Sequence, residues 1–132
     1  MSEELHAAAL VASANAALAA GGLTNPTKAY DVDDVPSPRP QNYVEIFVHR
    51  RAGGEFRACG WIGTTSWRVT ARYVARSVSN ARELRRRVTS GWEDIAVTVG
   101  GVESTRLVFE TSVPIGEDDG YYTGLDSWVY SL

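Results

Sequence analysis

The sequence predicts an α+β fold, with a mostly antiparallel β-sheet and a long central hairpin, packed by an N-terminal helix and by a second helix between strands. Three observations predict it. From Trp67 to Ala75, apolar and polar residues alternate with the period of a half-buried strand. An Ala-rich segment opens the chain, and residues 79–90 carry apolar side chains at helical spacing. A length of 132 residues fits a single domain, residues 1–132, that needs no disulfide or metal.

Residues 1–22 are predicted to form the N-terminal helix, from Ser2 to Ala20. Ser2 is expected to cap the helix, and Gly21-Gly22 is expected to end it. The predicted apolar stripe comprises Leu5, Ala8, Ala9, Ala12 and Ala16, widened by Leu10, Val11 and Leu18. A face made mostly of Ala allows close packing on a sheet or on another copy of the chain, and we expect it to pack on its own sheet.

Residues 23–42 are predicted to form a Pro-rich connector. Ala29 to Val32 is expected to be a short edge strand, and Pro36, Pro38 and Pro40 then prevent regular strand pairing. A run of alternating prolines is also typical of a polyproline ligand. We favour a stiff connector that delivers the chain to the central hairpin.

Residues 43–132 are predicted to hold the sheet with one inserted helix. The hairpin has a first arm from Tyr43 to His49 and a second arm from Trp61 to Ala75, joined by a Gly-rich tip, Arg50 to Glu55. The second arm is expected to place Trp67, Val69, Ala71, Tyr73 and Ala75 on one face and Arg68, Thr70, Arg72 and Arg76 on the other. A helix is the alternative, because those arginines are four residues apart, but the content of Thr, Val, Trp and Tyr favours a strand.

The second helix is predicted to start at Ser79 or Asn80, with Glu83 completing a capping box, and to stop at Gly91. Its apolar stripe is Ala81, Leu84, Val88 and Trp92. The opposite side carries Arg82, Arg86 and Arg87, with Arg85 at the edge of the stripe.

The last third of the chain is predicted to form strands again. Ile95 to Val99 leads into a two-residue turn, Gly100-Gly101. Thr105 to Val113 alternates, with Leu107, Phe109, Thr111 and Val113 expected on one face. Residues 114–120 are expected to be an acidic loop, and Trp128 to Leu132 to be the closing strand.

No catalytic or metal-binding pattern is visible. His6 and His49 lack spaced metal-ligand partners, and Cys59 lacks a neighbour that would lower its pKa. The acidic groups Asp31, Asp33 and Asp34, and Glu117, Asp118 and Asp119, do not have calcium-loop spacing. We therefore expect a non-enzymatic protein without a cofactor. A carboxylate site formed where the two groups meet is the remaining enzyme hypothesis.

The net charge of −3 conceals three blocks: residues 1–34 carry −4, residues 35–92 carry +8, and residues 93–132 carry −7. The basic residues of interest are Arg68, Arg72, Arg76, Arg82, Arg85, Arg86 and Arg87. We interpret them as partners for acids, either within the chain or in a neighbouring subunit. A nucleic-acid-binding segment over residues 68–87 and an ordinary solvated surface are the alternatives. The acidic, Ala-rich start is unlike a signal peptide, and no apolar run is long enough to span a membrane.

Three stretches carry a resemblance to a known family. They are Pro38 to Val44 entering the sheet, the helix Ser79 to Ser90, and the passage Asp118 to Tyr130, in which an aspartate-glycine-aromatic sequence leads into the last strand. With this order of elements, the chain resembles the tail terminator, or tail-completion, proteins of long-tailed bacteriophages.

The resemblance implies a structural protein of the virion, made in the host cytoplasm and located at the head–tail interface. Six copies are expected to form a ring that caps the tail tube, stops its polymerisation and contacts the head connector, while DNA passes through the lumen without specific contacts. A head-closure or adaptor protein of the connector is the alternative. For the subunit interface we expect Arg82, Arg85 and Arg86 to meet Asp118 and Asp119 of the next copy. For docking to the tube or connector we expect the hairpin tip, with Arg50, Arg51, Gly53, Gly54 and Glu55.

Overall fold

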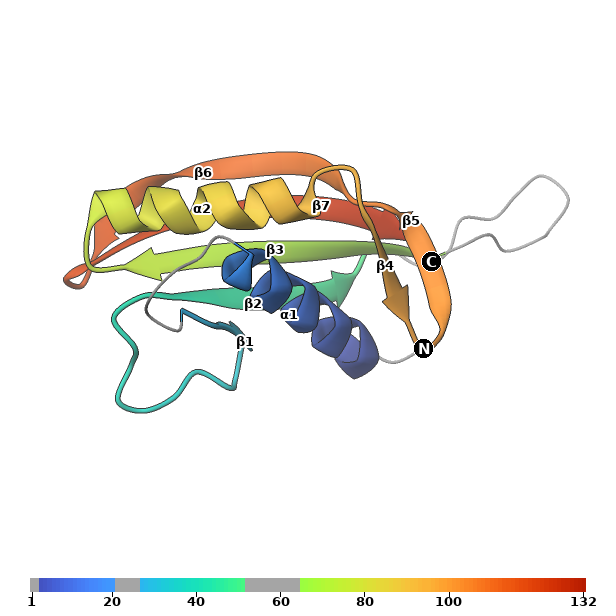
Figure 1. Ribbon diagram of the computed structural model, residues 1–132, viewed down its shortest axis with the longest axis horizontal. Coiled ribbons are helices and arrows are strands. Elements are labelled where there is room, and N and C mark those ends of the chain that lie inside the picture. Colours follow the sequence, from blue (N-terminus) through green and yellow to red (C-terminus); the bar gives the residue numbers. More distant parts are fainter. Residues whose placement is uncertain (1–2, 21–26, 52–64) are drawn as a thin grey trace, which may run out of the picture.

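The computed structural model describes residues 3–20, 27–51 and 65–132, and these form two helices and seven strands (Figure 1). The helices are α1 (Glu3–Ala19) and α2 (Val78–Trp92). The strands are β1 (Ala29–Asp31), β2 (Tyr43–Arg50), β3 (Ser66–Ala75), β4 (Ala96–Val99), β5 (Val102–Arg106), β6 (Val108–Asp118) and β7 (Tyr121–Ser131).

Five of the strands form one sheet in the order β1-β2-β3-β7-β6, and β4 and β5 form a separate two-stranded hairpin. β1 is parallel to β2, and the other neighbours are antiparallel. Both helices lie on the same side of the five-stranded sheet (Figure 1), with α1 against β1 and β2 and α2 against β3, β7 and β6. The predicted α+β fold is confirmed, and the sheet has one covered face and one open face.

The central hairpin pairs β2 with β3 as the alternation predicted. Val44, Ile46 and Val48 pair with Tyr73, Ala71 and Val69, and all six side chains are buried beneath the helices. Burying such apolar surface is the main stabilising contribution to a fold of this size. The predicted start of the second arm and most of the hairpin tip lie in residues 52–64, outside the described residues.

The predicted apolar stripe of α1 is confirmed at Leu10 and Leu18 but is wrong at Leu5 and at most of its alanines. The buried side chains are His6, Ala7, Leu10, Ala14 and Leu18. Leu5 is 49% exposed, and Ala8, Ala12 and Ala16 face away from the sheet. An Ala-rich helix has little contrast between its sides, so a buried histidine and two leucines decide which side packs. The predicted cap at Ser2 and the Gly21-Gly22 end lie outside the described residues.

The buried stripe of α2 is confirmed, but both predicted ends are wrong. Ser77 is the N-cap, and its hydroxyl accepts a hydrogen bond of 3.1 Å from the Asn80 N–H. Glu83 makes ion pairs with Arg86 and Arg87 instead of completing a capping box. Gly91 lies inside the helix, where a Cβ atom would collide with the side chain of Ala17. The glycine therefore allows α1 and α2 to approach closely.

The last third differs from prediction in where its strands break. The turn Gly100-Gly101 between β4 and β5 is confirmed, with φ of 57° and 82°. Leu107 interrupts the predicted strand, and its buried side chain separates β5 from β6. Phe109 pairs with Trp128, and Val113 pairs with Leu125. A bulge between Phe109 and Thr111 shifts the register, so Phe109 and Val113 lie on opposite faces of the sheet and not on one face as predicted.

The predicted acidic loop is largely strand, since β6 continues to Asp118 and only Asp119-Gly120 forms the turn to β7. Pro114 is compatible with this strand because β6 is an edge strand, where a missing N–H need not break the ladder. Acidic residues and proline also discourage unwanted pairing along an exposed edge.

Candidate functional site

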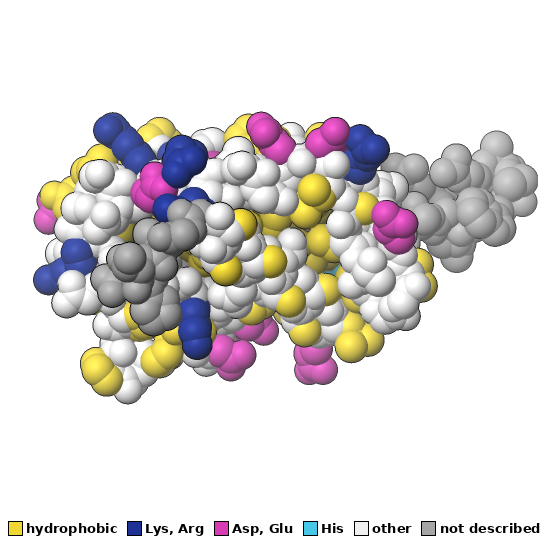
Figure 2. Space-filling view, viewed as in Figure 1, with side chains coloured by type: hydrophobic (Ala, Val, Ile, Leu, Met, Phe, Trp, Pro, Cys, Tyr) yellow, Lys and Arg dark blue, Asp and Glu magenta, His cyan; other side chains and the backbone are white. Residues whose placement is uncertain are grey.

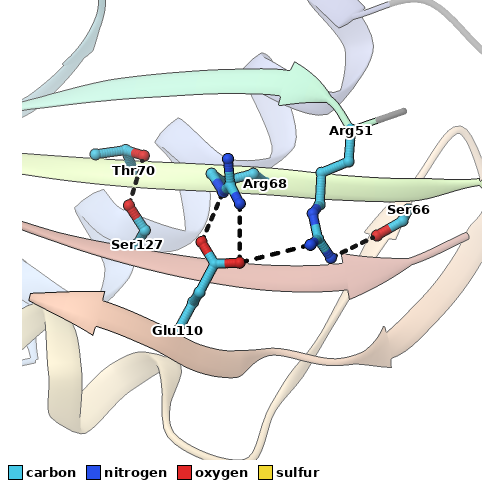
Figure 3. Close-up of polar contacts among 6 residues, drawn as sticks. All are labelled: Arg51, Ser66, Arg68, Thr70, Glu110 and Ser127. Carbon is cyan, nitrogen blue, oxygen red and sulfur yellow. Dashed lines mark hydrogen bonds and ion pairs between the residues drawn. The ribbon is translucent and has the colours of Figure 1, made fainter. Parts of the chain in front are cut away.

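The open face of the sheet carries arginines that are paired with acids of other strands. Arg68 of β3 binds Glu110 of β6, with 2.7 Å between Nε and Oε1 (Figure 3). Arg51 lies 3.7 Å from the same carboxylate and donates to the Ser66 hydroxyl. Between these strands, the hydroxyls of Thr70 and Ser127 are 3.0 Å apart. The guanidinium of Arg68 holds the pKa of Glu110 below its usual range.

A second group of contacts lies further along the same face. Arg72 is 3.3 Å from Glu45 on β2 and 3.3 Å from Asp118 on β6. Arg39 and Arg76 lie over the ring of Tyr121, at 4.3 Å and 4.8 Å from its centroid. On the open face, arginines of β3 are therefore paired with acids of β2 on one side and of β6 on the other, across β7.

The covered face contains a buried carboxylate at its centre. Asp126 of β7 is 2% exposed and accepts hydrogen bonds from Tyr73, at 2.9 Å, and from Ser112, at 2.6 Å. The Nε of Arg85 lies 3.4 Å from the carboxylate, and its Nη2 donates to the carbonyl of Val113 at 2.6 Å. Burial, followed by the charge of Asp126, raises the pKa of Tyr73, so the phenol remains a hydrogen-bond donor.

Gly124 provides the space for this arrangement. A Cβ atom at that position would lie 2.8 Å from Nη2 of Arg85 and 2.9 Å from the Ile115 side chain. The network therefore connects α2 to β3, β6 and β7 through one carboxylate and one guanidinium. Such a site can hold four elements in place.

His6 forms a second polar contact beneath the helices. Its ring stacks on Trp67 with 3.7 Å between centroids, and Nδ1 lies 2.7 Å from the Tyr130 hydroxyl. Burial is the main cause that lowers the pKa of His6, and burial also raises the pKa of Tyr130. The neutral imidazole is thus the form that fits this site.

The predicted interface residues are only partly free for a neighbour. Arg82 is exposed and makes no ion pair with any residue in the described part of the chain. Arg86 is exposed and bonds to Glu83 on its own helix, and this lowers the pKa of Glu83. Arg85, in contrast, is turned inward to Asp126.

The acids predicted to meet these arginines lie elsewhere. Asp118 pairs with Arg72 of its own chain, and Asp119 lies in the exposed β6–β7 turn with φ of 51°. Within the chain, the structure thus does not bring Asp118 or Asp119 to any of the three predicted arginines. Intramolecular pairing, which the charge pattern left open, accounts for Arg68, Arg72, Arg85, Arg86 and Arg87.

The predicted docking tip is described only at its base. Arg50 is the last residue of β2 and is exposed. Arg51 follows it, and its N–H donates to the carbonyl of Ser66 across the hairpin at 2.9 Å. Gly53, Gly54 and Glu55 lie outside the described residues, as does Cys59.

Residues 3–20, 27–51 and 65–132 contain no group of three or more His, Cys, Asp or Glu side chains placed to hold a metal ion. The two acidic groups singled out from the sequence therefore do not combine into a carboxylate site. Within these same ranges, none of the helices has the length and apolar character required to cross a membrane.

Two features of the covered face were missed by the sequence analysis. Asp126 lies two and four residues before the buried Trp128 and Tyr130 on the same strand, so all three side chains are on one face. This spacing was the available signal that Asp126 would point inward. His6 lies four residues before the buried Leu10 on the same side of α1, and this spacing was the corresponding signal there.

Comparisons with known proteins show the fold and go no further. A scan against protein-family models found no match, and a search of curated proteins also found none. A solved protein structure with 16% sequence identity superposes with a TM-score of 0.71 and covers 99% of this chain and 95% of that chain. The α+β arrangement therefore occurs over nearly the whole length of another protein.

Proposed function

We propose that this protein is a tail terminator of a long-tailed bacteriophage, a non-enzymatic virion component that forms a ring. Six copies cap the tail tube, stop its polymerisation and join it to the head connector. The resemblance of Pro38 to Val44, Ser79 to Ser90 and Asp118 to Tyr130 to such proteins supports the proposal. A single domain with a covered and an open sheet face is an arrangement from which a ring can be built.

The observation that carries the proposal is the matching of charges on the open face. Arg51 and Arg68 share Glu110, and Arg72 lies between Glu45 and Asp118. A DNA phosphate would have to displace these carboxylates before it could bind the guanidinium groups. We assign this face to the lumen of the ring, where DNA must pass without being held.

The same observation argues against a nucleic-acid-binding module. Such a module needs a surface with an excess of unpaired cations, and its affinity falls steeply as salt is raised. Here the arginines of segment 68–87 that form ion pairs are Arg68 and Arg72 on the open face, Arg85 in the internal network around Asp126, and Arg86 and Arg87 with Glu83. Within the described residues, Arg76 and Arg82 make no ion pair. Strong, salt-dependent binding of duplex DNA by the isolated protein would favour that alternative.

The test of the proposal is the mass in solution, measured by light scattering over a concentration series, with and without tail-tube subunits. We expect a six-copy ring, formed alone or on addition of the tube, and tubes of arrested length in its presence. A monomer at every concentration that also leaves tube growth unchanged would contradict the proposal. A ring that binds the connector and ignores the tube would instead favour the head-closure alternative.

A further inference from the structure

A hollow with acidic walls and an apolar floor lies at the β1 edge of the sheet. It has a volume of about 320 Å³ and a floor that includes Phe47 and Val48. The acids that line it are Glu3, Glu4, Asp31 and Asp33. None of these four carboxylates makes an ion pair with a cation in the part of the chain that the structure describes. Next to them, Val32 exposes 41% of its surface.

A basic surface lies at the opposite edge, on the flank of α2. Arg82, Arg86 and Thr89 are among the residues that line a groove of about 430 Å³ there. This flank faces the β6 side, because Gly91 on the other side of the helix contacts α1 and Arg85 reaches the Val113 carbonyl on β6. In Figure 2, Lys and Arg side chains gather over the start of α2 around an acidic one, and acidic side chains lie along both the lower and the upper edge.

The two surfaces cannot meet within one copy. The hollow is lined by residues of α1, β2 and the β1 segment, whereas the basic flank belongs to α2, which lies over β3, β7 and β6. Within the described residues, Arg82 has no ion-pair partner, and the single carboxylate of Glu83 serves both Arg86 and Arg87. Opposite charges that are left unmatched at opposite edges are what a head-to-tail contact between identical subunits requires.

We propose that the acidic hollow of one copy, formed by Glu3, Glu4, Asp31 and Asp33, receives the basic α2 flank of the next copy, with Arg82 and Arg86. The occupant is a second copy of this chain. The inference rests on the proposed ring and identifies its subunit interface, and it replaces Asp118 and Asp119 as the acidic partners. Asp118 already forms an ion pair with Arg72 of its own chain. The four acids of the hollow form no ion pair within the described residues.

The test uses two full-length charge-reversal variants and their mixture. Variant A carries Arg82→Glu and Arg86→Glu, and variant B carries Glu3→Arg, Glu4→Arg and Asp33→Arg, which gives the four positions of the hollow a net positive charge. Each variant alone brings like charges together at every contact, so we expect monomer mass at a concentration where the wild type is fully assembled. In an equimolar mixture an alternating ring has complementary charges at every contact, so we expect the mass of the wild-type ring to return.

The matched control replaces variant B with variant C, which carries Asp118→Arg and Asp119→Arg. Variant C keeps both proposed surfaces, so we expect C to form rings by itself and A to stay monomeric in the mixture. Circular dichroism melting identifies any variant that fails to fold. Rescue of A by C, or failure of folded A and B to assemble together, would overturn this inference while the wild-type ring still stood. Absence of the wild-type ring would contradict the proposed function itself.

Discussion

The two faces of the sheet use the same kinds of side chain in different surroundings. On the open face, Arg68 and Glu110 form an ion pair whose side chains are 32% and 27% exposed. On the covered face, the carboxylate paired with Arg85 is 3% exposed, and hydrogen bonds from Tyr73 and Ser112 replace its water. The comparison teaches that burial, more than residue type, decides how strongly a charge pair constrains the fold.

The largest effect is expected from Arg85→Met on the covered face. The substitution leaves the Asp126 carboxylate buried without its cation, and we expect the free energy of unfolding to fall by roughly 3 kcal/mol. Urea unfolding at fixed protein concentration measures this. The matched control is Arg106→Met, which removes an exposed partner of Asp94 and should cost less than about 1 kcal/mol. Equal effects of the two substitutions would remove the distinction between the faces.

An intermediate effect is expected from the titration of His6. The folded protein lowers the pKa of His6, so below its ordinary value of 6.5 the unfolded chain binds a proton that the folded chain does not. Stability contributed by the neutral ring is therefore fully present above pH 6.5 and is lost as the pH falls towards the folded pKa. We expect the melting temperature to fall between pH 7 and pH 5 in the wild type and to fall at most half as much in His6→Asn.

The control for this titration is His49→Asn, at the other histidine of the chain, which is exposed on β2. Its melting temperature should follow the wild-type pH dependence. A pH dependence that survives in His6→Asn and disappears in His49→Asn would mean that the stacked ring beside Trp67 is not the group that titrates.

The smallest effect is expected from Glu110→Gln on the open face. The carboxylate is solvated and shared by Arg51 and Arg68, so we expect a loss of less than about 1 kcal/mol. The loss should shrink further in 1 M salt, where exposed charges are screened. A loss as large as that of Arg85→Met, and insensitive to salt, would mean that the open face is covered in the folded protein.

Periodic patterns in the sequence predicted the central part of the fold. The alternation of Trp67 to Ala75 and the stripe from Ala81 to Trp92 each have one strongly apolar side, so only one orientation buries it. α1 lacked this contrast because Ala is tolerated on either side of a helix. The extent of β6 was missed because Pro114 and the acids are typical of loops as well as of edge strands.

The candidate sites were harder to predict because they depend on which strands are neighbours. Arg85 and Asp126 meet only because β7 lies between β3 and β6, and no local spacing in the sequence indicates that order. The charge blocks indicated that arginines would find acids, and on the open face they do so within the chain. The choice among Glu45, Glu110 and Asp118 as partners follows from strand register.

The contact between Gly91 and Ala17 has a consequence for symmetry. Because only the methyl group of Ala17 lies between the two helices at this point, their close approach constrains the angle between the acidic hollow at the start of α1 and the basic flank of α2. A head-to-tail contact closes into a ring only when its rotation divides a full turn, and it otherwise continues as an open helix. In the proposed ring, a single glycine, the penultimate residue of α2, would thereby help to set the number of copies at which the assembly closes.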